Sequence, residues 1–77
     1  MIIAGAGSAG EIIAKELLGH SQLGLNPIGF VDDDRRKHGH KMLDLPVMGA
    51  VSDLRALIGQ HDIDSVIIAM PRAPGKL

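Results

Sequence analysis

Six residues near the start of the chain, 5–10, have the composition of a phosphate-binding loop. They read G-x-G-x-x-G, follow a short apolar run and precede a segment with helical periodicity. In a strand–loop–helix of this kind the first glycine permits a sharp turn, the second lets a pyrophosphate approach the bare backbone, and the third lets the helix pack against the strand. The amides at the start of the helix then face the anion. The pattern predicts nucleotide contacts at Gly5, Gly7, Ser8, Ala9 and Gly10.

An acidic residue at the expected distance favours the same interpretation. Asp32 ends the apolar run 27–31 and follows the loop by about twenty residues, where a dinucleotide-binding fold keeps an acid for the ribose hydroxyls. We expect Asp32, and to a lesser extent Asp33, to contact the ligand. Two alternatives stay open, because any tight strand-to-helix turn favours glycine and because a run of acids after a strand is also typical of an exposed turn.

The basic residues that follow have two interpretations as well. Arg35, with Arg36 and Lys37, could bind an additional phosphate such as that of NADP or CoA. The alternative is an exposed loop whose positive charges are neutralised by the adjacent acids. We include Arg35 in the predicted site for the case of a ligand with an additional phosphate.

The hydrophobic pattern predicts the order β-α-β-(β)-α-β. We expect strands at 1–4, 27–32, 45–48 and 65–70, helices at 9–18 and about 52–59, and a polar loop at 33–44. The second strand is apolar almost throughout, which is typical of a parallel sheet buried on both faces. The alternation predicts a Rossmann-like α/β fold with three layers, α/β/α, and a small parallel sheet in the order 3-2-1-4.

Local signals predict how several of these elements begin and end. Ser8 and Glu11 have the spacing of a helix capping box, and Gly19 suits the end of the same helix. Ser52 is expected to cap the second helix. Pro46 favours an edge position for the third strand, because proline cannot donate to a ladder.

The predicted strand order reverses between the first and last strands, which places a crevice above the glycine loop. Open α/β sheets bind their ligands in such a crevice. Met70 and Pro71, at the end of the last strand, are expected to line it. Because a full dinucleotide fold has further strands, we interpret residues 1–77 as a single domain that looks truncated and is a fragment of a larger protein.

Composition excludes several other functions. A net charge of −1 gives no electrostatic basis for nucleic-acid binding, and the single aromatic residue, Phe30, offers no platform for stacked bases. Without cysteine there is no disulfide, thiol nucleophile or cysteine metal site. His38 and His40 have chelating spacing but no matching set of carboxylates, so we expect no metal. The apolar run 66–70 is far too short to span a bilayer, and we expect no membrane contact by this chain.

Taken together, four segments resemble a known family. They are Gly5 to Glu11, Ile28 to Asp34, Leu45 to Gly49 and Val66 to Pro71. In this order they look like the CoA-binding-like, Rossmann-type domain that precedes the catalytic domain in capsule and O-antigen nucleoside-diphosphate-sugar epimerases and 4,6-dehydratases. The resemblance covers nearly the whole chain. Similar domains also occur in initiating sugar-phosphate transferases and open some sugar O-acyltransferases.

The resemblance implies a nucleotide ligand and a role in bacterial polysaccharide biosynthesis. It implies NAD as the cofactor, with NADP, CoA or another nucleotide as alternatives, and a cytoplasmic location in a parent protein that can be anchored to the inner membrane. The family's catalytic Tyr-x-x-x-Lys lies in a later domain, and this chain has no tyrosine. We therefore expect the chain itself to be non-catalytic.

Two functions of different class remain at this point. The first is a nucleotide-binding domain with a structural or regulatory role. The second is an interaction or dimerisation domain of a sugar-phosphate transferase that keeps the fold and binds no ligand. Because a chain of 77 residues buries a small core, we also expect it to form a homo-oligomer or to dock on the rest of its parent protein.

Overall fold

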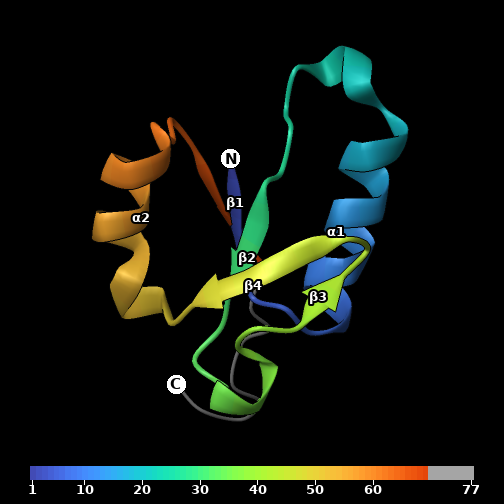
Figure 1. Cartoon of the computed structure of the whole chain (residues 1–77). Helices are drawn as coiled ribbons and strands as arrows, with labels where there is room; N and C mark the ends of the chain where they lie inside the picture. Colours follow the sequence, from blue (N-terminus) through green and yellow to red (C-terminus); the bar gives the residue numbers. More distant parts are fainter. Residues whose placement is uncertain (70–77) are drawn as a thin grey trace, which may run out of the picture.

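A five-stranded sheet lies between two α-helices in the computed structural model, which describes residues 1–69 (Figure 1). Short 3-10 turns follow α1, follow β2 and precede α2. The strands are β1 (Ile2–Ala4), β2 (Gly29–Val31), β3 (Lys41–Met42), β4 (Leu45–Gly49) and β5 (Val66–Ile68), and the helices are α1 (Ser8–Gly19) and α2 (Leu54–His61).

The four strands predicted from the sequence are all present, and their predicted order is confirmed. The sheet runs β3-β4-β2-β1-β5. β1 pairs in parallel with β2 on one side and β5 on the other, and β2 pairs in parallel with β4. β1 and β2 are buried along their whole length, as expected of strands that are covered on both faces. The carboxyl ends of β1, β2 and β5 therefore meet at one edge of the sheet.

The prediction of an entirely parallel sheet with a loop at 33–44 is wrong in one part. β3 forms an antiparallel hairpin with β4, so the sheet is mixed. The two-residue turn between them consists of Leu43 and Asp44, both at positive φ (56° and 65°). Such turns usually contain Asn-Gly or Asp-Gly, and a two-residue strand is too short for a periodic pattern. The sequence therefore gave no signal for this hairpin.

The edge position predicted for the third strand is also wrong, because β3 covers the outer side of β4. The amide of Val47 donates to the carbonyl of His40 (2.8 Å), and its carbonyl accepts from the amide of Gly39 (3.2 Å). These bonds lie beside Pro46, so the hairpin forms without the missing proline amide. Pro46 thus marks a position that cannot donate a hydrogen bond, although the strand that contains it still has a neighbour.

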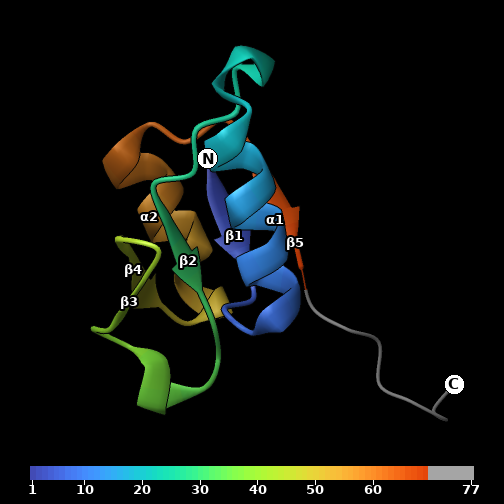
Figure 2. The same ribbon diagram turned by 90° about the vertical axis from the view of Figure 1, so that its right-hand side faces the viewer.

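The two helices cover opposite faces of the sheet, as predicted, and each face has its own core (Figures 1 and 2). On the α1 side, Ala14 and Leu17 belong to a buried cluster with Ile3 and Phe30. On the α2 side, Leu54 and Leu57 pack against Ile2 and Val31. Alternate residues of β1 and β2 thus point to different helices, which fixes the helices relative to the strand ends.

The two predicted N-terminal caps are wrong, whereas α1 ends at Gly19 as expected. α1 begins at Ser8 itself, its cap residue is Gly7, and no side chain caps it. Ser52 lies inside a 3-10 turn, Val51–Asp53, that precedes α2. The carboxylate of Asp53 accepts instead from the amide of Ala50 (2.9 Å). No side chain of the described residues therefore caps the first amides of α1, which precede the helical hydrogen-bond ladder.

Candidate functional site

The glycine loop links β1 to α1, and two of its glycines are required by the fold. Gly5 has φ of 119°, a conformation that residues with a side chain rarely adopt. A Cβ atom at Gly10 would overlap the carbonyl oxygen of Gly5 and lie 3.0 Å from its carbonyl carbon. Gly10 thus lets α1 approach the end of β1, which is the packing role expected of the third glycine.

Gly7 is different, because nothing in the fold requires glycine there. Its φ and ψ, −92° and −160°, are in the extended region open to any residue. Among the described residues other than its two chain neighbours, the only atom within 4 Å of a Cβ built on Gly7 is Nζ of Lys37, at 4.0 Å. The Cβ would therefore project into open space above the loop. This is the space that the second glycine of a dinucleotide fold leaves for a pyrophosphate.

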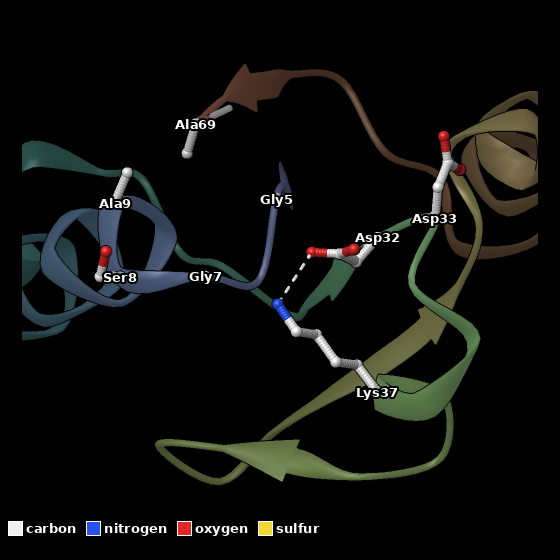
Figure 3. A pocket seen from close by; sticks show the side chains of 8 residues that line it. All are labelled: Gly5, Gly7, Ser8, Ala9, Asp32, Asp33, Lys37 and Ala69. Atoms are coloured by element: carbon white, nitrogen blue, oxygen red, sulfur yellow. Dashed lines mark ion pairs between the residues drawn. The ribbon is translucent and has the colours of Figure 1, made fainter. Parts of the chain in front are cut away.

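That open space is part of a cavity of about 450 Å³ at the carboxyl ends of the strands (Figure 3). Its size is in the range of small-molecule sites. Glu11 donates the first helical hydrogen bond to the carbonyl of Gly7 (3.0 Å), so the amides of residues 8–10 precede the helical ladder. The cavity is lined by Gly5, Gly7, Ser8, Ala9, Asp32, Asp33, Lys37 and Ala69.

Asp32 ties the glycine loop to the end of β2. Its Oδ2 accepts a hydrogen bond from the amide of Ala6 (2.8 Å), and its Oδ1 accepts one from the amide of Asp34 (2.8 Å). Its backbone carbonyl accepts from Nε2 of His38 (2.6 Å). The Asp32 side chain is only 18% exposed. The carboxylate therefore has a structural task in the fold, in addition to any contact with a ribose.

The surroundings of Asp32 favour its charged form. Burial raises the pKa of its carboxyl group, but the hydrogen bonds from the amides of Ala6 and Asp34 and the nearby charge of Lys37 outweigh this effect and lower the pKa below its ordinary value of 3.8. Because an ionised carboxylate is the stronger hydrogen-bond acceptor, it holds the two segments together more firmly than the protonated carboxyl group would. The tie between loop and β2 is therefore present at neutral pH.

The two acids after Asp32 have separate tasks. Oδ1 of Asp33 accepts from the amide of Val51 (3.0 Å) and so connects this loop to the turn before α2. Asp34 caps the 3-10 turn Arg35–Lys37 and pairs with Arg36 (2.9 Å), which holds the pKa of Asp34 at about 2. Only Asp32 and Asp33 line the cavity.

The structure brings together six of the predicted site residues. Gly10 lies behind the loop, where it packs against Gly5, and Arg35 is not among the lining residues. Met70 and Pro71 lie outside the described residues. The sequence-based prediction missed Ala69 and Lys37, although Lys37 belongs to the basic run considered for an additional phosphate. The predicted residues that do line the cavity are Gly5, Gly7, Ser8, Ala9, Asp32 and Asp33.

Replacing Asp32 with alanine is expected to lower the free energy of unfolding by about 1–3 kcal/mol, because two partly buried backbone amides lose their acceptor. Urea unfolding followed by circular dichroism measures the effect. Asp64→Ala is the matched control, since Asp64 is an exposed acid distant from the loop in sequence. Equal stability of the two variants would show that the Asp32 carboxylate does not hold the loop.

The lowered pKa of Asp32 also predicts a pH dependence of stability. A group with a depressed pKa in the folded state stabilises the fold above its unfolded pKa, and this stabilisation is lost as the pH falls through the folded value. The unfolding free energy should therefore fall below about pH 4, and it should fall less in Asp32→Asn, which does not titrate. Asp34 adds to the remaining loss. An equally steep fall in both proteins, measured between pH 5 and pH 2, would contradict the role of Asp32.

Two other kinds of site were considered for residues 1–69. No group of three or more His, Cys, Asp or Glu side chains in this range is arranged to hold a metal ion. Within the same range, no helix is long and apolar enough to cross a membrane. The cavity above the glycine loop remains as the candidate site, because it lies at the carboxyl ends of the strands, where open α/β sheets bind their ligands.

Comparisons with known proteins agree with this geometry. The family described as "CoA-binding domain" matches residues 1–76. The chain is 34% identical over 70 residues to the probable polysaccharide biosynthesis protein EpsC of Bacillus subtilis, covering 91% of this chain and 12% of EpsC. It is 31% identical over 76 residues to the capsular polysaccharide biosynthesis protein CapD of Staphylococcus aureus, covering 97% of this chain and 13% of CapD. The chain thus spans about an eighth of the length of these relatives.

A solved structure shows the same fold. The UDP-D-quinovosamine 4-dehydrogenase from Vibrio fischeri superimposes with a TM-score of 0.76 and 39% sequence identity, over 94% of this chain and 57% of that chain. The family match covers nearly all residues, and the two relatives and the solved structure each cover more than nine tenths of the chain. The chain therefore belongs to the CoA-binding domain family, with a Rossmann-like fold, and it is similar to polysaccharide biosynthesis proteins and to a UDP-sugar dehydrogenase.

Proposed function

We propose that the cavity above the glycine loop binds a nucleotide, and that this nucleotide is NAD. The observation that supports this proposal most is Gly7, whose backbone needs no glycine and whose missing side chain leaves the cavity open. The amides at the start of α1 precede the helical ladder and can bind a diphosphate. NADP, CoA and a UDP-sugar share that diphosphate and are the competing ligands.

Of these competing ligands, an adenine dinucleotide is supported by Asp32, whose carboxylate lines the cavity. Each carboxylate oxygen accepts one amide hydrogen bond, and an ionised carboxylate can accept about four in total. Capacity therefore remains for the hydroxyl groups of a ribose at the end of β2. Arg35, which does not line the cavity, would become relevant only for a ligand with an additional phosphate.

In the parent protein the domain would have a structural or regulatory role rather than a catalytic one. The chain has no tyrosine, and the cavity holds no histidine or tyrosine that could exchange protons with a sugar. We propose that the parent is a nucleoside-diphosphate-sugar epimerase or 4,6-dehydratase of bacterial polysaccharide synthesis, and that residues 1–77 form one unit within it. The cytoplasmic location implied by the resemblance stays a prediction.

Calorimetric titration of the chain with NAD, NADP, CoA and UDP-N-acetylglucosamine tests the ligand. We expect saturable one-to-one binding of NAD that is tighter than binding of the other three. Tighter binding of CoA or NADP would identify that nucleotide as the ligand instead of NAD. Arg35 would then be a candidate for binding its additional phosphate. No heat from any of the four ligands would contradict nucleotide binding.

An interaction domain is the second candidate, and one observation favours it. Ile68 on the edge strand β5 is 76% exposed, and Ile12 on α1 is 68% exposed. Exposed apolar side chains and an open strand edge are common features of interfaces. A homo-oligomer, or docking of this side on the parent protein, would cover them. Light scattering over a concentration series tests self-association, and a monomer at every concentration would contradict it.

A further inference from the structure

Lys37 reaches the glycine loop from a segment about thirty residues away, and within residues 1–69 it is the basic side chain that lines the cavity. Its Nζ lies 3.5 Å from the carbonyl oxygen of Ala6 and 3.6 Å from Oδ2 of Asp32. It also lies 4.0 Å from the position of a Cβ on Gly7. Figure 3 shows the side chain extending from the 3-10 turn after β2 toward the loop, with the ion pair to Asp32 as a dashed line.

These contacts hold Lys37 loosely. A charge-assisted hydrogen bond between an ammonium and a carboxylate is typically about 2.7–2.9 Å long, so a separation of 3.6 Å is an ion pair without a good hydrogen bond. The side chain of Lys37 is 38% exposed. Asp32, for its part, is already held by the amides of Ala6 and Asp34. The fold therefore does not depend on Lys37 to position the carboxylate.

The neighbouring Arg36 shows what a fixed structural ion pair looks like in the same turn. Its guanidinium makes two hydrogen bonds to the carboxylate of Asp34, at 3.0 and 2.9 Å, and its side chain is 90% exposed. Arg36 does not line the cavity. The two residues are adjacent and have the same charge, but only Lys37 has an ammonium next to the space above Gly7.

We propose that Lys37 is a specificity-determining residue that binds the diphosphate of the ligand above Gly7. This inference rests on the proposed nucleotide binding and adds to it the side chain that neutralises the charge of the diphosphate. When the ligand enters, the ammonium exchanges its long contact with Asp32 for a shorter one with a phosphate oxygen. An ammonium has three donors on a flexible stem, so this exchange needs no movement of the backbone.

The positive charge of Lys37 also offsets the negative charges that a bound diphosphate would meet in the cavity. A diphosphate brings two negative charges to a cavity that already contains the carboxylates of Asp32 and Asp33. The amides of α1 supply only partial positive charge. Without a cation beside them, the two carboxylates would repel the diphosphate. Lys37 reduces this repulsion for every diphosphate ligand and gives no advantage to a nucleoside without phosphate.

The test compares Lys37→Met with Arg36→Met, which removes the same charge from the same turn. Each variant and the parent chain is titrated by calorimetry with NAD, CoA, UDP-N-acetylglucosamine and adenosine, at two salt concentrations. For whichever diphosphate ligands bind the parent, Lys37→Met should weaken binding about tenfold and reduce its salt dependence. Arg36→Met should change these affinities less than about twofold. Adenosine, which has no phosphate, should bind all three proteins equally.

Lys37→Arg, which keeps the charge, should restore most of the affinity lost in Lys37→Met. Circular dichroism spectra and urea unfolding of the variants confirm that each is folded before titration. If the parent binds a diphosphate ligand and Lys37→Met binds it equally well, the inference is wrong while nucleotide binding stands. Equal losses in Lys37→Met and Arg36→Met would also contradict it, because they would indicate a general charge effect. If none of the ligands binds the parent, both the inference and the proposed function are wrong.

Discussion

Replacing Gly10 with alanine is expected to destabilise the fold strongly. The added methyl group would overlap the carbonyl oxygen of Gly5, and the aromatic ring of Phe30 lies 3.6 Å away on the same side. The clash is with backbone, so no rotation of a side chain relieves it, and α1 must move away from β1. We expect a loss of about 3 kcal/mol or more, which is a large share of the stability of a domain of this size.

Gly19→Ala is the matched control for Gly10→Ala. Gly19 is also part of α1, its φ is not positive, and no atom of the described residues beyond its own helix lies within 4 Å of an added Cβ. Alanine there should be neutral or stabilise the fold by up to about 1 kcal/mol. Urea unfolding of both variants measures the contrast. A Gly10→Ala protein as stable as the parent would show that α1 does not approach β1 in this way.

Replacing Gly7 with valine should preserve the fold and abolish nucleotide binding, in contrast to Gly10→Ala, which should mainly lower stability. The backbone at Gly7 is extended, which suits a β-branched residue, and only the flexible end of Lys37 lies near the new Cβ. The valine side chain would occupy the space through which a diphosphate reaches the amides of α1. We expect affinity for the nucleotide to fall at least about a hundredfold, a change of roughly 2.7 kcal/mol.

Calorimetry with the nucleotide that binds the parent chain measures this loss, and urea unfolding measures the fold. Gly59→Val is a control for the added side chain, because Gly59 lies on α2 and no atom of the described residues beyond its own helix lies within 4 Å of its Cβ position. Valine has a higher helix propensity than glycine, so that variant should stay folded and bind the nucleotide with unchanged affinity. If Gly7→Val remains folded and binds as tightly as the parent, the ligand does not approach the backbone at Gly7.

Much of the fold could be predicted because its signals are local and repeated. The apolar runs at β1 and β2 and the helical periodicity of α1 are independent of each other, and together they imply the strand order. The missed hairpin had no such support. Its turn places Leu43 and Asp44 at positive φ, where the sequence has neither glycine nor asparagine, and tertiary contacts with β4 must stabilise it.

The candidate site was predictable where it depends on backbone and less so where it depends on long side chains. The glycine loop and Asp32 have fixed spacing in this kind of fold. The structural role of Asp32, which holds the glycine loop, could not be predicted from the sequence. Its partners Ala6 and Asp34 donate through backbone amides, which every residue type except proline has. Lys37 and Arg36 are equivalent in the sequence, and only the 3-10 turn directs one to the cavity and the other to Asp34.

The most direct test of nucleotide binding at the glycine loop is a ¹H–¹⁵N correlation spectrum of the labelled chain titrated with NAD. A ligand in the cavity should shift the amide signals of Ser8, Ala9 and Gly10 most, together with that of Lys37, since these lie at the start of α1 and beside the space above Gly7. Signals of α2 residues 54–61 should move little. A titration that leaves the amides of residues 8–10 unchanged, or shifts only residues far from the loop, would contradict the account.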